Sequence, residues 1–201
     1  MTESRVLQEI ERDSLLYRES GGGVTFSGGE PLLQAEFLLR LLEGCRALGI
    51  HTIVDTCGAA AFQAIERVAD VADLIRYDLK HLDDDRHRRL TGTTNREILD
   101  NLCGLALRNA AVRVRFPLVP GVNDDLSHVR RLAQFVASLG LSDIDVLPYR
   151  AVAAGRYESL GRANPSARVP EPGPDTVAEV VRVMADCGLS AAVVDRRPNG
   201  V

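Results

Sequence analysis

Short apolar segments alternate along this chain with longer amphipathic ones, and this alternation limits the folds that the chain can adopt. In the amphipathic segments the apolar residues recur at helical spacing, whereas the short segments are largely apolar and end at polar or glycine residues. The expected strands cover residues 24–27, 51–56, 74–79, 112–119, 143–149 and 190–194. The expected helices cover residues 4–18, 37–48, 62–72, 96–109, 126–139 and 175–187. Repeated strand–helix units of this length predict an α/β fold with a parallel sheet, open or barrel-like.

Three local signals refine this prediction. Pro117 is expected to break the strand at residues 112–119, because proline cannot donate a hydrogen bond to a sheet ladder. The acidic segment that ends at Asp125 offers an N-cap for the helix beginning at residue 126. Residues 83–89 mix acidic and basic side chains, and we expect them to form a solvated face rather than a binding patch.

The composition is that of an ordinary globular protein, with 201 residues, 45% hydrophobic and 26% charged, and it predicts a single domain over residues 1–201. A net charge of −4, an aromatic content of 4% and the absence of tryptophan argue against nucleic-acid binding. The N-terminus is amphipathic and acidic, unlike a signal peptide, and no apolar run approaches the length of a membrane span. We therefore expect a cytoplasmic protein with no membrane partner.

The string SGGEP at residues 27–31 is the most informative local feature. Gly28 and Gly29 have no Cβ, so their backbone can lie close to a ligand. Glu30 places a carboxylate at the mouth of the same turn, where it could receive an ammonium group. The segment lacks the Lys-Ser/Thr ending of a phosphate-binding P-loop and the G-x-G-x-x-G register of a dinucleotide fold. The turn therefore suits the amino end of an amino-acid-like cofactor.

Polar residues also follow the other expected strands, at the carboxyl ends where parallel α/β folds hold their ligands. Beyond the SGGEP turn they are Asp55, Asp78, Lys80, Arg115 and Arg150. We expect all of them to line one pocket. Two neighbouring carboxylates such as Asp55 and Asp78 repel each other unless Lys80 neutralises one or a small cation bridges both.

Simpler structural roles remain open for the same residues. Asp55 and Asp78 each suit the cap of the turn that follows. Arg115 is suited to a ligand carboxylate or phosphate, but equally to a salt bridge with an aspartate on a neighbouring strand.

The cysteines and histidines show no spacing typical of metal ligands. The four cysteines, predicted to be reduced and mainly core residues, are Cys45, Cys57, Cys103 and Cys187. The four histidines, predicted to be structural or surface residues, are His51, His81, His87 and His128.

Four segments together carry a resemblance to a known family. They read GGGVTFSGGEPLLQAEFLLRLLEGCRALGIHTIVDTCG, LIRYDLKH, RFPLVPGVND, and VLPYR followed by GRYESLG. Over nearly its whole length the chain resembles the radical SAM enzymes that activate glycyl radical enzymes, of which the pyruvate formate-lyase activating enzymes are the best known. The resemblance implies a partial (β/α)6 barrel that holds S-adenosylmethionine (SAM) along its strand ends.

The resemblance also implies roles for the residues at the strand ends. The methionyl amine of SAM would lie at Gly28, Gly29 and Glu30. The methionyl carboxylate would lie near Asp55, Asp78, Lys80 and Arg115, with a monovalent cation at the two aspartates. Where the family usually has a histidine that contacts the ribose, this chain has Arg150 as the expected donor.

In that family, SAM is cleaved reductively by an electron from a [4Fe-4S] cluster, and a glycyl radical is installed on a partner enzyme. An electron donor such as flavodoxin or ferredoxin is implied as a second partner. The family's C-x-x-x-C-x-x-C loop follows a first strand that this chain is expected to lack. We therefore predict an N-terminally truncated fragment without cluster ligands, whose strand at 24–27 forms an open sheet edge.

Two further functions remain as alternatives. The chain could be a non-catalytic SAM-binding or partner-binding remnant of the family. It could also be an unrelated (β/α) enzyme, such as an aldolase, in which Lys80 forms a Schiff base with a carbonyl substrate. Lys80 is accordingly the candidate catalytic residue.

Overall fold

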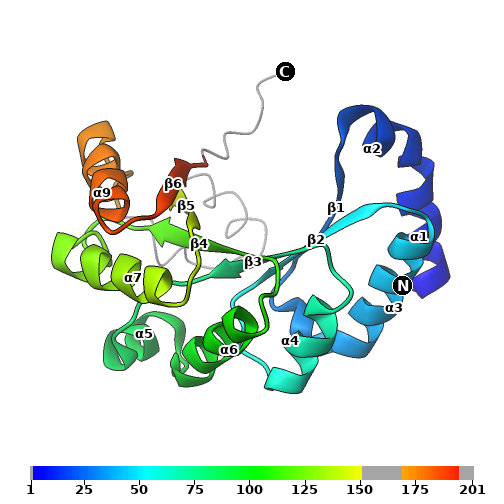
Figure 1. The fold of residues 1–201 in the computed structure, drawn as a ribbon, viewed down its shortest axis with the longest axis horizontal. Helices are drawn as coiled ribbons and strands as arrows, with labels where there is room; N and C mark the ends of the chain where they lie inside the picture. The colour runs from blue at the N-terminus through cyan, green and yellow to red at the C-terminus, as the bar shows by residue number, and fades with distance from the viewer. Residues whose placement is uncertain (1, 151–168, 195–201) are drawn as a thin grey trace. The chain divides into compact units, whose positions relative to one another are not determined.

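The structure, a computed structural model, describes residues 2–150 and 169–194 of the chain (Figure 1). The described residues fall into two compact units. The first unit holds residues 2–78 and 83–113, and the second holds residues 79–82, 114–150 and 169–194. The organisation as a single domain over residues 1–201 stays a prediction.

The first unit is built from three strands and the helices around them (Figure 1). Its strands are β1 (Gly23–Phe26), β2 (His51–Thr56) and β3 (Leu74–Asp78). Its helices are α1 (Glu3–Arg12), α2 (Ser14–Ser20), the 3-10 helix η1 (Pro31–Gln34), α3 (Ala35–Ala47), α4 (Phe62–Ala69), α5 (Asp84–Thr91) and α6 (Arg96–Leu107). These bounds confirm the predicted strands and most predicted helices to within a few residues.

The three strands of the first unit pair in parallel, in the order β1-β2-β3. Phe26 pairs with Val54, and Thr56 pairs with Tyr77. The carboxyl ends of all three strands therefore lie at the same edge of this sheet. Among the described residues β1 pairs with β2 alone, so its other side is an open edge, as expected from the sequence.

Alternation along β2 and β3 decides which side chains belong to the core and which to the site. Val54 and Ile75 are fully buried, together with apolar residues of the surrounding helices. Those helix residues are Leu42, Ile65 and Leu102, on α3, α4 and α6. Because successive strand residues face opposite sides of a sheet, Asp55 and Arg76 lie on the face away from these helices.

The predicted helix over residues 4–18 is interrupted at Asp13, which separates α1 from α2. The backbone N–H of Asp13 bonds to the carbonyl of Ile10 at 3.2 Å, a tight final turn that ends α1. The helical spacing of Ile10 and Leu15 predicts that both lie on one apolar side of a continuous helix, and this prediction is wrong. Leu15 lies on α2, beyond the break, and is 65% exposed, whereas Ile10 on α1 is buried.

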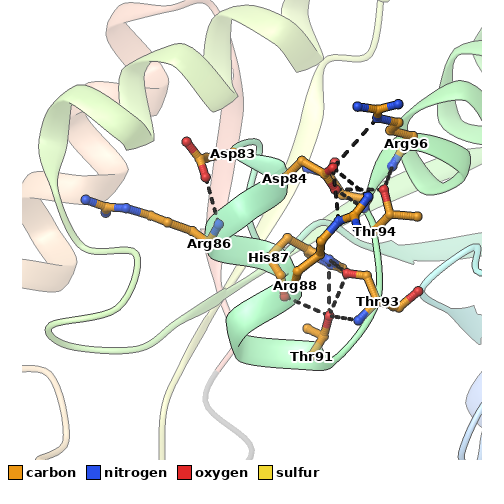
Figure 2. A network of polar contacts seen from close by, with 10 residues as sticks. Asp83, Asp84, Arg86, His87, Arg88, Thr91, Thr93, Thr94 and Arg96 are labelled. Atoms are coloured by element: carbon orange, nitrogen blue, oxygen red, sulfur yellow. Dashed lines mark hydrogen bonds and ion pairs between the residues drawn. The ribbon is translucent and has the colours of Figure 1, made fainter.

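The charged segment at residues 83–89 is largely helical, which the sequence prediction missed (Figure 2). Asp83 caps α5 by accepting a hydrogen bond from the Arg86 N–H at 2.7 Å. The next residue, Asp84, accepts hydrogen bonds from the Thr94 hydroxyl and the Asn95 N–H, at 2.7 and 3.0 Å. These bonds, with an added contribution from Arg88, lower the Asp84 pKa to about 2. Asp83 therefore caps α5 and Asp84 ties α5 to the residues before α6, so the segment has a structural role as well as a solvated face.

The second unit has parallel strands in the order β4-β5-β6 and two helices that pack against each other. Its strands are β4 (Val112–Leu118, of which residues 114–118 belong to this unit), β5 (Asp143–Pro148) and β6 (Ser190–Val193). Its helices are α7 (Leu126–Ser138) and α9 (Pro174–Asp186). Asp125 caps α7 as predicted, accepting a hydrogen bond from the His128 N–H at 2.9 Å. No helix in the described ranges is long and apolar enough to cross a membrane.

Pro117 does not break β4, contrary to the prediction. Leu118, the next residue, still accepts a hydrogen bond from the Tyr149 N–H at 2.8 Å, so pairing with β5 continues past the proline. The Pro117 carbonyl accepts a hydrogen bond from the Asn123 side chain at 2.7 Å. As a result, Arg115 lies in the middle of β4 and not at its end, where it was expected.

Candidate functional site

The turn after β1 leaves a stretch of backbone open to a ligand. Gly28 has a φ of 155°, a value that residues with a side chain rarely adopt. Both Gly28 and Gly29 are exposed, and a Cβ built on either would have no heavy atom within 4 Å. The glycine turn therefore faces open space at the carboxyl end of β1, and its approach to a ligand stays a prediction.

The Glu30 side chain ties this turn to the end of β2. Its Oε1 accepts hydrogen bonds from the Thr56 hydroxyl at 2.6 Å and the Leu32 N–H at 3.1 Å. Its Oε2 accepts from the Cys57 N–H at 2.9 Å and the Cys57 thiol at 3.0 Å. A carboxylate has room for about four hydrogen bonds, so protein donors use the full capacity of Glu30. The role as an ammonium acceptor stays a prediction, and an added donor would share an oxygen with these bonds.

The loop after β2 is held in a shape that requires glycine. Gly58 has a φ of 72°, and a Cβ built on it would lie 1.7 Å from the Tyr77 hydroxyl oxygen. Tyr77 is fully buried and donates a hydrogen bond to the Ile98 carbonyl at 2.6 Å. Burial raises the pKa of Tyr77, so the hydroxyl remains a proton donor. The Gly58 N–H donates to the Thr56 hydroxyl at 2.9 Å, which joins this loop to Glu30.

Asn101 on α6 binds the same loop through its side chain, a contact that sequence reasoning missed. Its Nδ2 donates to the carbonyls of Gly58 and Ala60, at 2.8 and 2.7 Å. Asn101 is 3% exposed, in a helix whose other buried residues are apolar. An asparagine on the apolar face of a helical pattern was the signal that could have indicated a buried polar contact.

Asp55 is buried on the sheet face of the first unit that lies away from α3, α4 and α6, in an ion pair with Arg76 of the next strand. The two residues are register partners, and Arg76 Nε lies 2.7 Å from Asp55 Oδ1. Arg76 Nη2 also donates to the Thr25 hydroxyl at 3.2 Å. The sequence analysis assigned no role to Arg76, which reads as one polar residue in an apolar strand. Asp78 is the last residue of β3 and is half-buried at the same edge.

Three further predicted residues, Lys80, Arg115 and Arg150, belong to the second unit. The Lys80 backbone carbonyl accepts a hydrogen bond from Asn123 Nδ2 at 3.1 Å. Arg115 is 6% exposed, and its register partner on β5 is Asp145, which is 7% exposed. This pairing keeps open the structural role of Arg115 as the partner of a neighbouring aspartate. The convergence of these residues with the glycine turn stays a prediction.

Asn123 organises the segment of the second unit that carries Lys80. Besides bonding to the Lys80 and Pro117 carbonyls, its Oδ1 accepts a hydrogen bond from the Val119 N–H at 2.8 Å. Asn123 is 3% exposed, so it acts as a buried link between the end of β4 and the residues after β3. Asn123 belongs to the motif RFPLVPGVND, and from the sequence it was expected only to be part of the segment that caps the helix at residue 126.

Arg150 forms an ion pair with Glu171, with Nη1 2.5 Å from Oε2. It also lines a cavity of about 540 Å³ beside α9. The other lining residues are Pro148, Pro172, Pro174, Val177, Ala178, Val181 and Val193. Among the described lining residues Arg150 is the cation, placed where it could contact a ligand's sugar, and that contact stays a prediction.

The cysteines do not provide an iron–sulfur site. Cys45, Cys103 and Cys187 belong to α3, α6 and the end of α9, and Cys57 follows β2. Burial raises the pKa of the Cys45 and Cys103 thiols, which disfavours the thiolate form that binds iron. No group of three or more metal-binding side chains gathers anywhere in residues 2–150 and 169–194. The side chains present therefore do not fit a [4Fe-4S] cluster.

The histidines have the structural environments that were predicted for them. His81 and His128 are buried and stack ring on ring, with their centroids 3.9 Å apart. His87 is buried on α5, where its Nδ1 lies 2.9 Å from the Thr93 carbonyl (Figure 2).

Comparison with known proteins assigns the chain to a family. Residues 1–135 match the model of the radical SAM superfamily. The chain is 31% identical over 191 residues to a pyruvate formate-lyase-activating enzyme of Listeria monocytogenes, covering 90% of this chain and 77% of that protein. It is 36% identical over 181 residues to a trans-4-hydroxy-L-proline dehydratase activating enzyme of Clostridioides difficile, covering 89% and 60%. It is 41% identical over 164 residues to a choline trimethylamine-lyase activating enzyme of Oleidesulfovibrio alaskensis, covering 80% and 53%.

Solved structures agree with this assignment and confirm the predicted fold class. A domain of a pyruvate-formate lyase-activating enzyme from Bacteroides vulgatus superposes with a TM-score of 0.74 at 32% identity, covering 86% of this chain and 99% of that one. A radical SAM methyltransferase from Sphaerobacter thermophilus has a TM-score of 0.76 at 19% identity, covering 98% and 58%, and shows likeness of fold alone. The chain spans only about half to three-fifths of the Oleidesulfovibrio and Clostridioides relatives. It nonetheless belongs to the radical SAM superfamily.

Proposed function

We propose that this chain forms the SAM-binding part of an enzyme that activates a glycyl radical enzyme. The relatives at 31–41% identity are activating enzymes, and the family implies SAM and a [4Fe-4S] cluster as cofactors. The protein partner would be a glycyl radical enzyme. The partner is assigned by analogy with the relatives, and the sequence indicates that the protein works in the cytoplasm.

The observation that carries this proposal is the open glycine turn joined to the end of β2. Gly28 and Gly29 present bare backbone toward open space, and Glu30 fixes that backbone against Thr56 and Cys57. A rigid and uncovered backbone edge suits the amino-acid moiety of SAM, because binding then costs little ordering of the protein. The two glycines would hold the methionyl amine through their backbone.

The remaining predicted contacts belong to the same proposal. Asp55, Asp78, Lys80 and Arg115 would surround the methionyl carboxylate, and Arg150 would donate a hydrogen bond to the ribose. In this superfamily SAM and a reduced cluster supply radical chemistry, while the protein binds and orients them. Since the described cysteines do not fit a cluster, we assign this chain no electron-transfer step. The electron donor, flavodoxin or ferredoxin, would act on a cluster held by other residues.

Calorimetric titration of the purified chain with SAM, in the absence of iron, tests the proposal. We expect saturable binding by the wild type and at least tenfold weaker binding by Gly29→Val, because the valine side chain would fill the space in front of the backbone. Nothing lies within 4 Å of a Cβ at Gly29, so the variant should melt at nearly the wild-type temperature. Absence of binding by the wild type, or equal binding by a folded Gly29→Val, would contradict the proposal.

A second candidate function is favoured by the cysteine arrangement, namely a SAM-binding or partner-binding module that holds no cluster. Anaerobic incubation of the chain with iron and sulfide tests this second function. A module takes up no iron and develops no visible absorbance, yet still binds SAM in the titration. Uptake of a redox-active cluster by the chain alone would exclude this second function.

A further inference from the structure

The buried carboxylate of Asp55 already has a positive charge beside it, supplied by the protein. Asp55 is 7% exposed and lies on the sheet face of the first unit that is away from the helices. The resemblance implies a monovalent cation there, shared with Asp78. Arg76 Nε lies 2.7 Å from Asp55 Oδ1, within hydrogen-bond distance. A carboxylate this buried requires a cation or several donors, and a guanidinium provides both in one group.

The position of the Arg76 guanidinium is fixed by three neighbouring strands. The register of β2 and β3 sets Arg76 directly opposite Asp55. Its Nη2 reaches across β2 to the Thr25 hydroxyl on β1, at 3.2 Å. The side chain of Arg76 is only 22% exposed, so the ion pair is partly shielded from solvent. Arginine keeps its charge at all ordinary pH values, which makes it a permanent cation at this site.

We propose that Arg76 replaces the monovalent cation at Asp55, so that the site of this chain works without bound sodium or potassium. A metal ion at Asp55 would have to displace the Arg76 Nε or approach a guanidinium of the same charge. Both are unfavourable in a site with little solvent. The side chains present therefore do not fit the implied cation, since the protein contributes the charge itself.

The proposal is tested by thermal unfolding in potassium chloride, sodium chloride and choline chloride at equal ionic strength, without SAM. Arg76→Met removes the charge and keeps the length of the side chain. Arg67→Met is the matched control, because Arg67 pairs with Glu36 in an exposed ion pair between α4 and α3. We expect Arg76→Met to unfold about 6–20 °C lower and the control within about 4 °C of the wild type.

The response to the salts decides the matter. For the wild type and Arg67→Met the unfolding midpoint is expected to be the same in all three salts. For Arg76→Met, potassium or sodium should raise the midpoint above its value in choline, because Asp55 then takes up the ion. Adding Asp55→Asn to Arg76→Met should abolish this response. The proposal is overturned if the wild type and Arg76→Met respond to the cations alike; if Arg76→Met does not fold, Arg76→Gln takes its place.

A second measurement links Arg76 to the cofactor, and this part of the inference rests on the proposed function. SAM affinity of the wild type should be equal in potassium and choline salts, whereas that of Arg76→Met should fall at least several-fold in choline. If the wild type binds no SAM, the proposed function fails while the unfolding comparison still decides the role of Arg76. If SAM binds to the wild type only with potassium or sodium, the role of Arg76 fails and the proposed function stands.

Discussion

Replacing the Glu30 carboxylate by an amide, in Glu30→Gln, should destabilise the first unit strongly. Each oxygen of Glu30 accepts from one backbone N–H, that of Leu32 or that of Cys57. Whichever way the glutamine amide turns, its NH2 group faces one of these donors, which loses its acceptor. A part-buried donor without an acceptor costs about 1–3 kcal/mol, and the loss of charge weakens the remaining bonds by about 1 kcal/mol more. We expect the free energy of unfolding to fall by about 2–4 kcal/mol.

Thermal unfolding followed by circular dichroism measures this loss. For a protein of this size about 2–4 °C corresponds to 1 kcal/mol, so the midpoint should fall by roughly 4–16 °C. Glu36→Gln is the matched control, since its side chain is 66% exposed and its ion pair with Arg67 is screened by solvent and should contribute little to stability. If Glu30→Gln unfolds at the same temperature as Glu36→Gln, the four hydrogen bonds of Glu30 do not hold the turn and the reasoning is refuted.

Two further changes probe the loop after β2 and the hydrogen bonds of Asp84 at the start of α5. Gly58→Ala should lower the unfolding midpoint by at least about 5 °C, because its Cβ would clash with the Tyr77 hydroxyl at an unfavourable φ; a change within 1 °C, measured by calorimetry, would contradict this. The Asp84 pKa, lowered mainly by the Thr94 hydroxyl, contributes stability that is present above the unfolded pKa of 3.8 and lost as the pH falls toward 2. Urea unfolding between pH 5 and 2 should therefore show a steeper loss in the wild type than in Asp84→Asn, and parallel curves would exclude this role.

Most elements of the fold could be predicted from periodicity because each is defined by its own residues. The strand at residues 51–56 and the helix after Asp125 were predicted with nearly their observed bounds. The failed predictions concern elements that depend on polar contacts or on strand pairing, and not on the periodicity of apolar residues. Helix α5 carries few apolar residues and is stabilised by the Asp83 cap and by the hydrogen bonds of Asp84 to Thr94 and Asn95, which periodicity does not detect. Pro117 was expected to end β4, but it leaves the pairing of Leu118 with β5 intact.

The sequence predicted which types of residue follow the strands, but not which contacts those residues make. The sequence indicated a glycine pair at a strand end whose backbone could lie close to a ligand; the structure shows both glycines exposed, and the contact with a ligand stays a prediction. The role of Asn101 depends on the packing of α6 beneath a loop more than 40 residues earlier in the chain. The helical pattern could have indicated that Asn101 makes a buried polar contact, but its partners are decided only when the whole unit folds.

From the sequence alone follow the order of strands and helices, the open glycine turn and the family resemblance, since all three depend on neighbouring residues. Only the tertiary structure decides which polar groups are available to a ligand. Glu30 bonds to residues 26 and 27 positions away, and Asp55 to a residue 21 positions away. Those partners are chosen by strand register and by the path of the loops, and both are fixed by packing of the core.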